Sequence, residues 1–335
     1  MSKVENKLRG LDDDEFAKAF MKSELHQLYE DHKDELFLGV RNNYLNLYYN
    51  CDSIAEITYK KGKKSIVCEI DRYYLDGISR KDKDKEKKAK NLQPGEICKK
   101  YEKIKKYSNE RNKVEKKAQS ILINNNNRNE SSNWFCIDIE YAKSYENKAE
   151  RKDAKCSPRF DIIAISKKSP HKVALIELKY GNKAIGGKSG IYKHIEDDIK
   201  FCKKGFFESQ LKKEIVNIIK NLSELGVDIP SDISSEAPPV LLAPEFYFIT
   251  LNNNAKNDKA STPKQTMGGY LFNKEDNHWK SIKFSEKTIL NKYRLDVTKK
   301  SSEFHATFLF SKQTLDKITI KDIIDDDSYE KIIPS

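Results

Sequence analysis

Two charged residues stand at the end of an apolar segment in the stretch VALIELKYG, residues 173–181. Side chains alternate between the two faces of an extended segment, so Glu177 and Lys179 point to the same face. Burying either charge without a partner is costly, and we therefore expect the pair to serve a purpose. A carboxylate can hold a metal ion and a nearby ammonium can position a water, which is the chemistry that phosphodiester hydrolysis requires.

The position of this Glu-x-Lys triplet is more informative than the triplet itself. The same spacing also occurs at 5–7, 86–88, 115–117, 146–148 and 150–152, always in polar surroundings. Only the triplet at 177–179 ends an apolar strand, where both charges are held near a core. The alternative interpretation is an ordinary salt bridge at the end of a strand, which contributes little stability when it is exposed.

Asp161 lies in the preceding apolar segment, PRFDIIAI. A hairpin joining 159–166 to 172–180 brings Asp161 beside Glu177 or Lys179 if the register allows. Two carboxylates that converge at one sheet edge repel each other unless a cation or a proton separates them. Lys179 cannot neutralise both, so we expect a hard divalent cation with oxygen ligands, Mg²⁺ for preference.

An Asp on one strand, followed by an apolar strand that ends in Glu-x-Lys, resembles the PD-(D/E)XK nuclease superfamily. The order of the expected elements from about residue 109 to 251 is also similar to the helix–strand–strand–strand–helix–strand core of that superfamily. The resemblance covers under half of the chain, and Arg159-Phe160 precedes Asp161 where many members have proline. It implies Mg²⁺, for which Mn²⁺ can substitute, with Asp161, Glu177 and the Leu178 carbonyl as ligands and Lys179 as the water-positioning residue.

The resemblance implies further residues near this site. Many members contribute a helix carboxylate, which either Glu110 or Glu115 could supply; Glu115 is preferred because it lies beside an apolar helical stripe. Glu140 shares a face of strand 134–142 with Asp138, and it is either an additional ligand or a structural acid. His194 and Asp198 lie four residues apart on helix 191–202 and should face the sheet, with His194 as the candidate for a polar group near Lys179.

The remaining elements surround this core. Residues 11–37 have a helical pattern, and 43–50, 53–59 and 65–70 alternate as three short strands. The segment 80–90 has seven basic and three acidic residues and is expected to be a linker or loop. A helical region follows at about 96–123, and the core contributes strands 134–142, 159–166, 172–180 and 244–251 with helices 191–202 and about 206–225.

The predicted fold class is therefore α/β, a restriction-endonuclease-like core with a mixed sheet. We expect an N-terminal α+β unit at 1–78, a charged linker at 79–95, the core at 96–255, and extra C-terminal strands at 256–335. GGYLF and EFHATFLF are two of these expected strand segments.

The net charge of +11 favours a polyanionic partner, and nucleic acid is favoured over a membrane surface. DNA is the nucleic acid that we expect. Six isolated cysteines without a CxxC pair argue against a structural zinc site, and no apolar run approaches the ~18 residues of a membrane span. We expect a cytoplasmic nuclease; a catalytically inactive nucleic-acid-binding protein and a protein-interaction module are the alternatives. The sequence does not distinguish endonuclease from exonuclease action, or DNA from RNA as substrate. A homodimer and a role in restriction, repair or defence also stay open.

Overall fold

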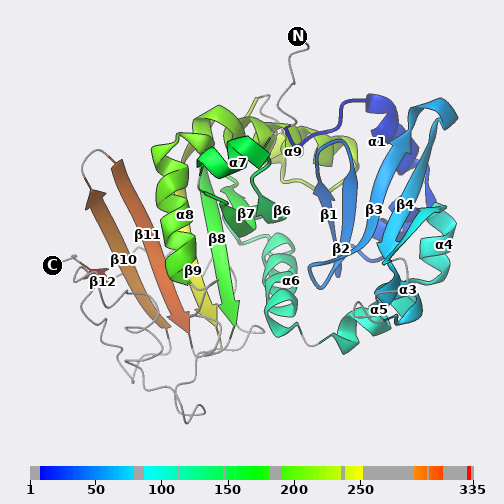
Figure 1. Ribbon diagram of the computed structural model, residues 1–335, viewed down its shortest axis with the longest axis horizontal. Helices are drawn as coiled ribbons and strands as arrows, with labels where there is room; N and C mark the ends of the chain where they lie inside the picture. The colour runs from blue at the N-terminus through cyan, green and yellow to red at the C-terminus, as the bar shows by residue number, and fades with distance from the viewer. Residues whose placement is uncertain are drawn as a thin grey trace. The chain divides into compact units, whose positions relative to one another are not determined.

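The structure is a computed structural model that describes residues 8–78, 87–111, 113–145, 148–154, 156–180, 191–234, 238–251, 290–299, 302–311 and 330–332. The chain divides into two compact units, each with its own β-sheet, so the protein has a mixed α/β architecture (Figure 1). The antiparallel unit comprises residues 7–120 and 213–239. The mixed-sheet unit comprises residues 1–6, 121–212 and 240–335, so the expected core range 96–255 is shared between the two units.

The antiparallel unit contains a five-stranded sheet in which each strand pairs with the next along the chain. Its strands are β1 (Leu36–Val40), β2 (Leu45–Tyr49), β3 (Asp52–Lys60), β4 (Ser65–Asp71) and β5 (Lys88–Leu92). The three strands expected from the sequence are β2, β3 and β4. Asn50 and Cys51 join β2 to β3 with φ of 51° and 54°, the backbone that a tight two-residue hairpin turn requires.

The helices of this part of the chain are α1 (Asp14–Met21), α2 (Glu24–Asp31), α3 (Arg72–Asp76), α4 (Pro94–Lys99), α5 (Tyr101–Glu110) and α6 (Val114–Asn127), with the 3₁₀ turn η1 (Lys61–Lys63) between β3 and β4. The helix expected over 11–37 is therefore two helices followed by the start of β1. Ser23 interrupts it, because its backbone is extended and its hydroxyl donates to the Phe20 carbonyl at 2.6 Å.

The expected linker 79–95 contains regular structure at its C-terminal end. Residues 79–86 lie outside the described part of the chain, whereas β5 occupies 88–92 as an edge strand. Lys88 and Lys90 are exposed and Ala89 is buried, an alternation with charged residues that suits a sheet edge. The helical region expected at 96–123 is divided into α4, α5 and α6, with breaks at Lys100 and at the extended Arg111.

The mixed-sheet unit has a seven-stranded sheet in the order β12-β10-β11-β9-β8-β7-β6. Its strands are β6 (Trp134–Ala142), β7 (Arg159–Ser166), β8 (His171–Tyr180), β9 (Leu241–Leu251), β10 (Leu290–Lys299), β11 (Ser302–Ser311) and β12 (Glu330–Ile332). β6, β7 and β8 are antiparallel neighbours, and β9 pairs parallel to both β8 and β11. The expected strands at 134–142, 159–166, 172–180 and 244–251 are confirmed, EFHATFLF lies in β11, and GGYLF lies outside the described residues.

The later helices are α7 (Lys148–Ala154), α8 (Ile191–Lys203), the π-helical turn η3 (Phe207–Leu211), α9 (Lys212–Glu224) and α10 (Ser231–Ser234). α8 runs along one face of the mixed sheet, in front of β9 and between β11 and β8 in the view of Figure 1. Phe201 of α8 packs edge-to-face against Phe160 of β7 and Phe246 of β9, with ring centroids 5.5 and 6.2 Å apart. These contacts fix α8 over the carboxyl-terminal half of β8, where Glu177 and Lys179 lie.

The outer edge of β6 is occupied by a side chain of α6. The Asn127 amide donates to the Cys136 carbonyl at 3.0 Å, and its oxygen accepts from the Cys136 N–H at 2.8 Å. Asn126 and Ser132 both donate to the Trp134 carbonyl, at 3.0 and 3.3 Å. Side chains from one helix and the following turn therefore satisfy main-chain groups of β6 that do not pair with β7.

Candidate functional site

Glu177 and Lys179 lie near the end of β8, a central strand between β7 and β9. Apolar residues fill β8 because both of its faces are covered, so the two charged side chains are buried as well. The Glu177 side chain is 4% exposed and the Lys179 side chain is 10% exposed. The sequence predicted that this triplet is held near a core, and the structure confirms its burial.

The carboxylate of Glu177 is the centre of a compact charged group. Its Oε1 atom lies 2.6 Å from Nζ of Lys179 and 3.0 Å from Nε2 of His194. Within the described part of the chain, neither Glu177 oxygen accepts a hydrogen bond of good geometry, although both are fully buried. The carboxylate is thus close to two nitrogen atoms but retains acceptor capacity that these residues do not use.

Asp161 joins this group from the neighbouring strand. The β7–β8 ladder pairs Ile162 with Ile176, and next to that pair the Leu178 N–H donates to Oδ2 of Asp161 at 2.8 Å. A side-chain carboxylate thereby takes the place of a main-chain acceptor beside the Glu-Leu-Lys triplet. The sequence predicted a hairpin but left its register open, and the observed pairing brings Asp161 beside the triplet.

The pKa of Glu177 is raised well above its ordinary value, first by burial and then by the negative charge of Asp161, while Lys179 opposes the shift. Repulsion between two neighbouring carboxylates was the reason to expect a cation here, and the raised pKa has this repulsion as one of its causes.

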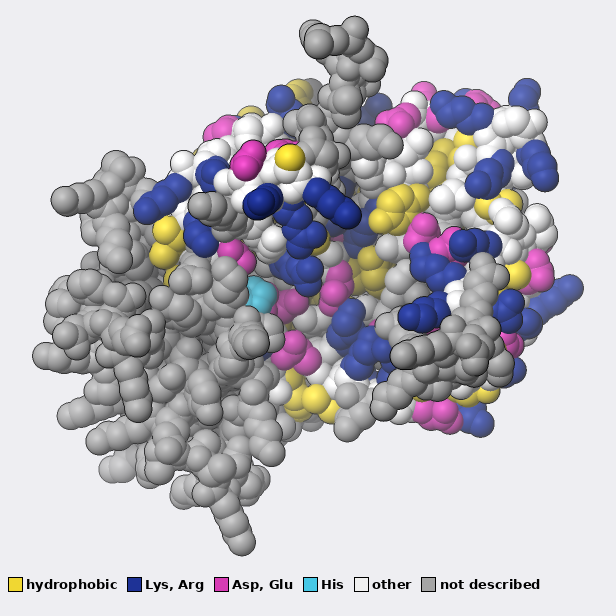
Figure 2. Space-filling model, in the orientation of Figure 1, with side chains coloured by type: hydrophobic (Ala, Val, Ile, Leu, Met, Phe, Trp, Pro, Cys, Tyr) yellow, Lys and Arg dark blue, Asp and Glu magenta, His cyan; other side chains and the backbone are white. Residues whose placement is uncertain are grey.

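Helix α8 contributes His194 and Asp198, which the i, i+4 spacing placed on one face. His194 reaches Glu177 and keeps its side chain 20% exposed, so it links the buried carboxylate to the surface. On the face drawn in Figure 2, Lys and Arg side chains are spread over much of the described surface, with Asp and Glu side chains between them. Asp198 is 4% exposed, and burial followed by the charge of Asp197 raises its pKa well above the ordinary range. The i, i+4 spacing predicted an orientation for Asp198 but no role.

Asp138 and Glu140 of β6 do not share an environment as expected. The register of β6 shifts between Cys136 and Asp138, and Glu140 has a left-handed backbone with φ of 50°. Asp138 is fully buried and accepts a hydrogen bond from the Ile139 N–H at 2.9 Å, whereas Glu140 is half-buried. The register shift precedes both residues, and the pairing from Asp138 to Ala142 has no further shift, so the shared face stays a prediction while the two residues differ in burial.

Glu140 nevertheless lies at an informative register position. The pairs Ile139–Ile162 and Tyr141–Phe160 flank it, which places Glu140 opposite Asp161 along the β6–β7 ladder. Its role as a further ligand stays a prediction, as does that of the Leu178 carbonyl. Glu115 lies in the first turn of α6 within the residues of the antiparallel unit, and Glu110 ends α5 there; the choice between them also stays a prediction.

The oxygen donors beside Glu177 are few, and Mg²⁺ is the cation expected from the sequence. No group of three or more His, Cys, Asp or Glu side chains among the described residues has the arrangement to hold a metal ion. Mg²⁺ needs fewer protein ligands, because it is commonly held by one or two carboxylates while it keeps waters and substrate oxygens. Asp161 and the Glu177 carboxylate, buried and without a well-formed hydrogen bond, fit this smaller requirement.

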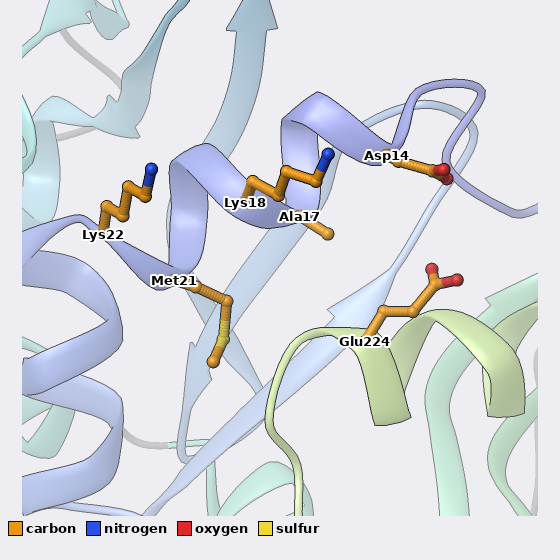
Figure 3. Close-up of a pocket in the computed structure, with 6 residues that line it drawn as sticks. All are labelled: Asp14, Ala17, Lys18, Met21, Lys22 and Glu224. Carbon is orange, nitrogen blue, oxygen red and sulfur yellow. The ribbon is translucent and has the colours of Figure 1, made fainter.

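A cavity of about 410 Å³ lies in the antiparallel unit, between α1 and the end of α9 (Figure 3). Six residues line it: Asp14, Ala17, Lys18, Met21, Lys22 and Glu224. Its charged groups are surface side chains around an apolar methionine. This combination has no buried carboxylate or histidine and offers no chemistry comparable to that at Glu177.

Comparisons with protein-family models, with curated proteins and with solved structures found no match. Among the helices that the structure describes, none combines the length and the apolar character needed to cross a membrane.

Proposed function

We propose that this protein is a Mg²⁺-dependent nuclease of the PD-(D/E)XK type that hydrolyses phosphodiester bonds of DNA. The observation that carries the proposal is the buried Glu177 carboxylate, which contacts Lys179 and His194 and has Asp161 beside it on the adjacent strand. Such an arrangement of unlike and like charges is uncommon for a purely structural strand end, because burial makes each charge expensive.

The order of the elements supports the same proposal. Helix α6, strands β6, β7 and β8, helix α8 and strand β9 follow one another in the order helix–strand–strand–strand–helix–strand, with α7, η3, α9 and α10 as additions. The charge of +11 supports a polyanionic substrate.

Each residue has a definite role in this proposal. Asp161 and Glu177 would hold Mg²⁺, which when bound polarises a phosphoryl oxygen and lowers the pKa of a water. The Lys179 ammonium orients the attacking water and offsets negative charge that develops on the phosphoryl group. His194 contacts the same Glu177 oxygen as Lys179 and restrains the orientation of that carboxylate.

Cleavage of plasmid and oligonucleotide DNA, with Mg²⁺ or Mn²⁺ and with chelator, tests the proposal. Asp161→Asn is the sharpest variant, because the amide oxygen can still accept the Leu178 N–H while the charge is lost. We expect it to lower cleavage by at least 100-fold, the scale of losing one electrostatic contact to the transition state, about 10²–10³. Lys179→Met should do the same, and Lys172→Met, on the exposed start of the same strand, should leave cleavage unchanged.

Wild-type cleavage rates in Asp161→Asn and Lys179→Met would remove the proposal. Metal-independent DNA binding without turnover would instead identify a catalytically inactive nucleic-acid-binding protein. Absence of both DNA binding and metal binding would favour an interaction module.

A further inference from the structure

The antiparallel unit has a second group of aromatic and basic side chains, formed by α3, α5 and the residue that follows α5. Tyr73 and Tyr107 are half-exposed, with ring centroids 6.0 Å apart. Nζ of Lys103 lies 5.7 Å from the centre of the Tyr107 ring, and the Arg111 guanidinium lies 5.2 Å from that of Tyr73. Together with exposed Lys106, these residues form what we call the tyrosine–lysine face.

Some of the positive charges in this region neutralise buried acids and therefore hold the fold together. Residues 99–117 contain nine Lys and Arg but three Glu. Lys113 and Arg111 share the buried carboxylate of Asp52, at 2.8 and 3.5 Å. Nζ of Lys105 lies 2.6 Å from Oε1 of Glu35, which is half-buried.

Lys103 and Lys106 are used differently. Both are exposed, and the Glu110 carboxylate lies 4.0 Å from Lys106, at the limit of an ion pair. Lys103 contacts the Tyr107 ring rather than an acid in the described structure. Two cations on one helical face, at i and i+3, thus keep most of their capacity to bind an external anion.

We propose that the tyrosine–lysine face binds single-stranded DNA. The Tyr73 and Tyr107 rings offer stacking surfaces to unpaired bases, and Lys103 and Lys106 lie beside them to contact phosphates, the combination that single-strand binding sites use. A duplex hides its base faces and can use only the cations, so a single strand gains more from this face. The inference rests on the proposed nuclease function only for the choice of DNA.

Fluorescence anisotropy of labelled oligo-dT, with chelator present so that no cleavage occurs, tests the charges. The double variant Lys103→Gln/Lys106→Gln should reduce the slope of log binding constant against log salt concentration by about 1.4, because each of the two lost phosphate contacts on a single strand contributes about 0.7. The matched control is Lys60→Gln/Lys63→Gln, which removes the same charge at the β3–β4 turn, the opposite end of β4 from α3. Equal effects of the two double variants would overturn the proposal.

The tyrosines are tested with paired substitutions that separate stacking from packing. Tyr107 packs against Gly77, so Tyr107→Leu retains an apolar side chain there, and Tyr107→Phe retains the ring. We expect Tyr107→Leu to weaken oligo-dT binding about tenfold, while Tyr107→Phe binds as wild type and duplex binding is unchanged by either. Tighter binding of duplex than of oligo-dT, or wild-type affinity of Tyr107→Leu, would contradict single-strand binding; tighter binding of oligo-rU would assign the face to RNA.

Failure of this inference and failure of the nuclease proposal are distinguishable. Asp161→Asn should bind oligo-dT with wild-type affinity and lose cleavage. A protein that binds oligo-dT through this face but never cleaves DNA would keep this inference and remove the nuclease.

Discussion

The contact between Lys179 and Glu177 makes a specific prediction about stability. At 2.6 Å and an effective dielectric constant of about 20, the attraction between the two charges is roughly 6 kcal/mol. Desolvation of both groups offsets much of this in the wild type, but Lys179→Met removes the attraction and leaves a buried carboxylate behind. We expect this variant to lose ~3–5 kcal/mol of unfolding free energy, the usual result of removing one partner of a buried pair.

A double-mutant cycle separates this effect from loss of packing. Adding Glu177→Gln removes the stranded charge, so the double variant should be at least ~2 kcal/mol more stable than the sum of the single effects predicts. Urea unfolding at pH 7.5 in chelator measures the cycle. Trp134 is buried in β6, so its fluorescence reports on the mixed-sheet unit.

The cycle with Lys172→Met in place of Lys179→Met is the control, because Lys172 is exposed on the same strand. Its effects should be additive with those of Glu177→Gln. Additivity of Lys179→Met and Glu177→Gln within about 0.5 kcal/mol would refute the reasoning, since distant and independent sites behave in that way.

Three further predictions follow from the same structure. A divalent cation at 100 times its dissociation constant should stabilise the wild type by about 2.7 kcal/mol. For a unit of this size, that free energy corresponds to a rise in Tm of roughly 5–11 °C. Asp161→Asn should lose this rise in a thermal shift assay. The raised pKa of Asp198 means that the folded chain keeps a proton which the unfolded chain releases, so in chelator the unfolding free energy should fall as pH rises from the ordinary carboxyl range toward neutrality. Asp198→Asn should make that decrease shallower, and an unchanged slope would assign it to other groups. Asp52→Asn should destabilise the antiparallel unit by about 3–5 kcal/mol, since Lys113 and Arg111 lose their shared buried partner, and circular dichroism during urea unfolding would detect this.

The sequence predicted the central strands because they carry long apolar runs with few competing patterns. Ile162 to Ile165 and Val173 to Ile176 could only be buried, and the short connection between them set the antiparallel register that places Asp161 beside the Glu-Leu-Lys triplet. The i, i+4 spacing of His194 and Asp198 was equally informative, since the period of a helix fixes which side chains share a face.

The features that the sequence did not predict depend on local backbone choices. Nothing in CIDIEY indicates that the strand shifts register at Ile137 or that Glu140 adopts a left-handed backbone, so the full burial of Asp138 beside a half-buried Glu140 was not predicted. Ser23 likewise ends one helix through a bond to the carbonyl of Phe20 that a periodic pattern does not reveal. β5 was missed because Lys88 and Lys90 give an edge strand the composition of a solvated loop.

The Asn127 side chain on the outer side of β6 has a consequence for self-association. An uncovered outer strand invites another copy of the chain to add its own strand and continue the sheet across two molecules. At Cys136, both main-chain groups that an incoming strand needs are already bound to the Asn127 amide. A homodimer built by joining two sheets through β6 would first have to break these internal bonds, so a stable pair of molecules is better sought through other surfaces.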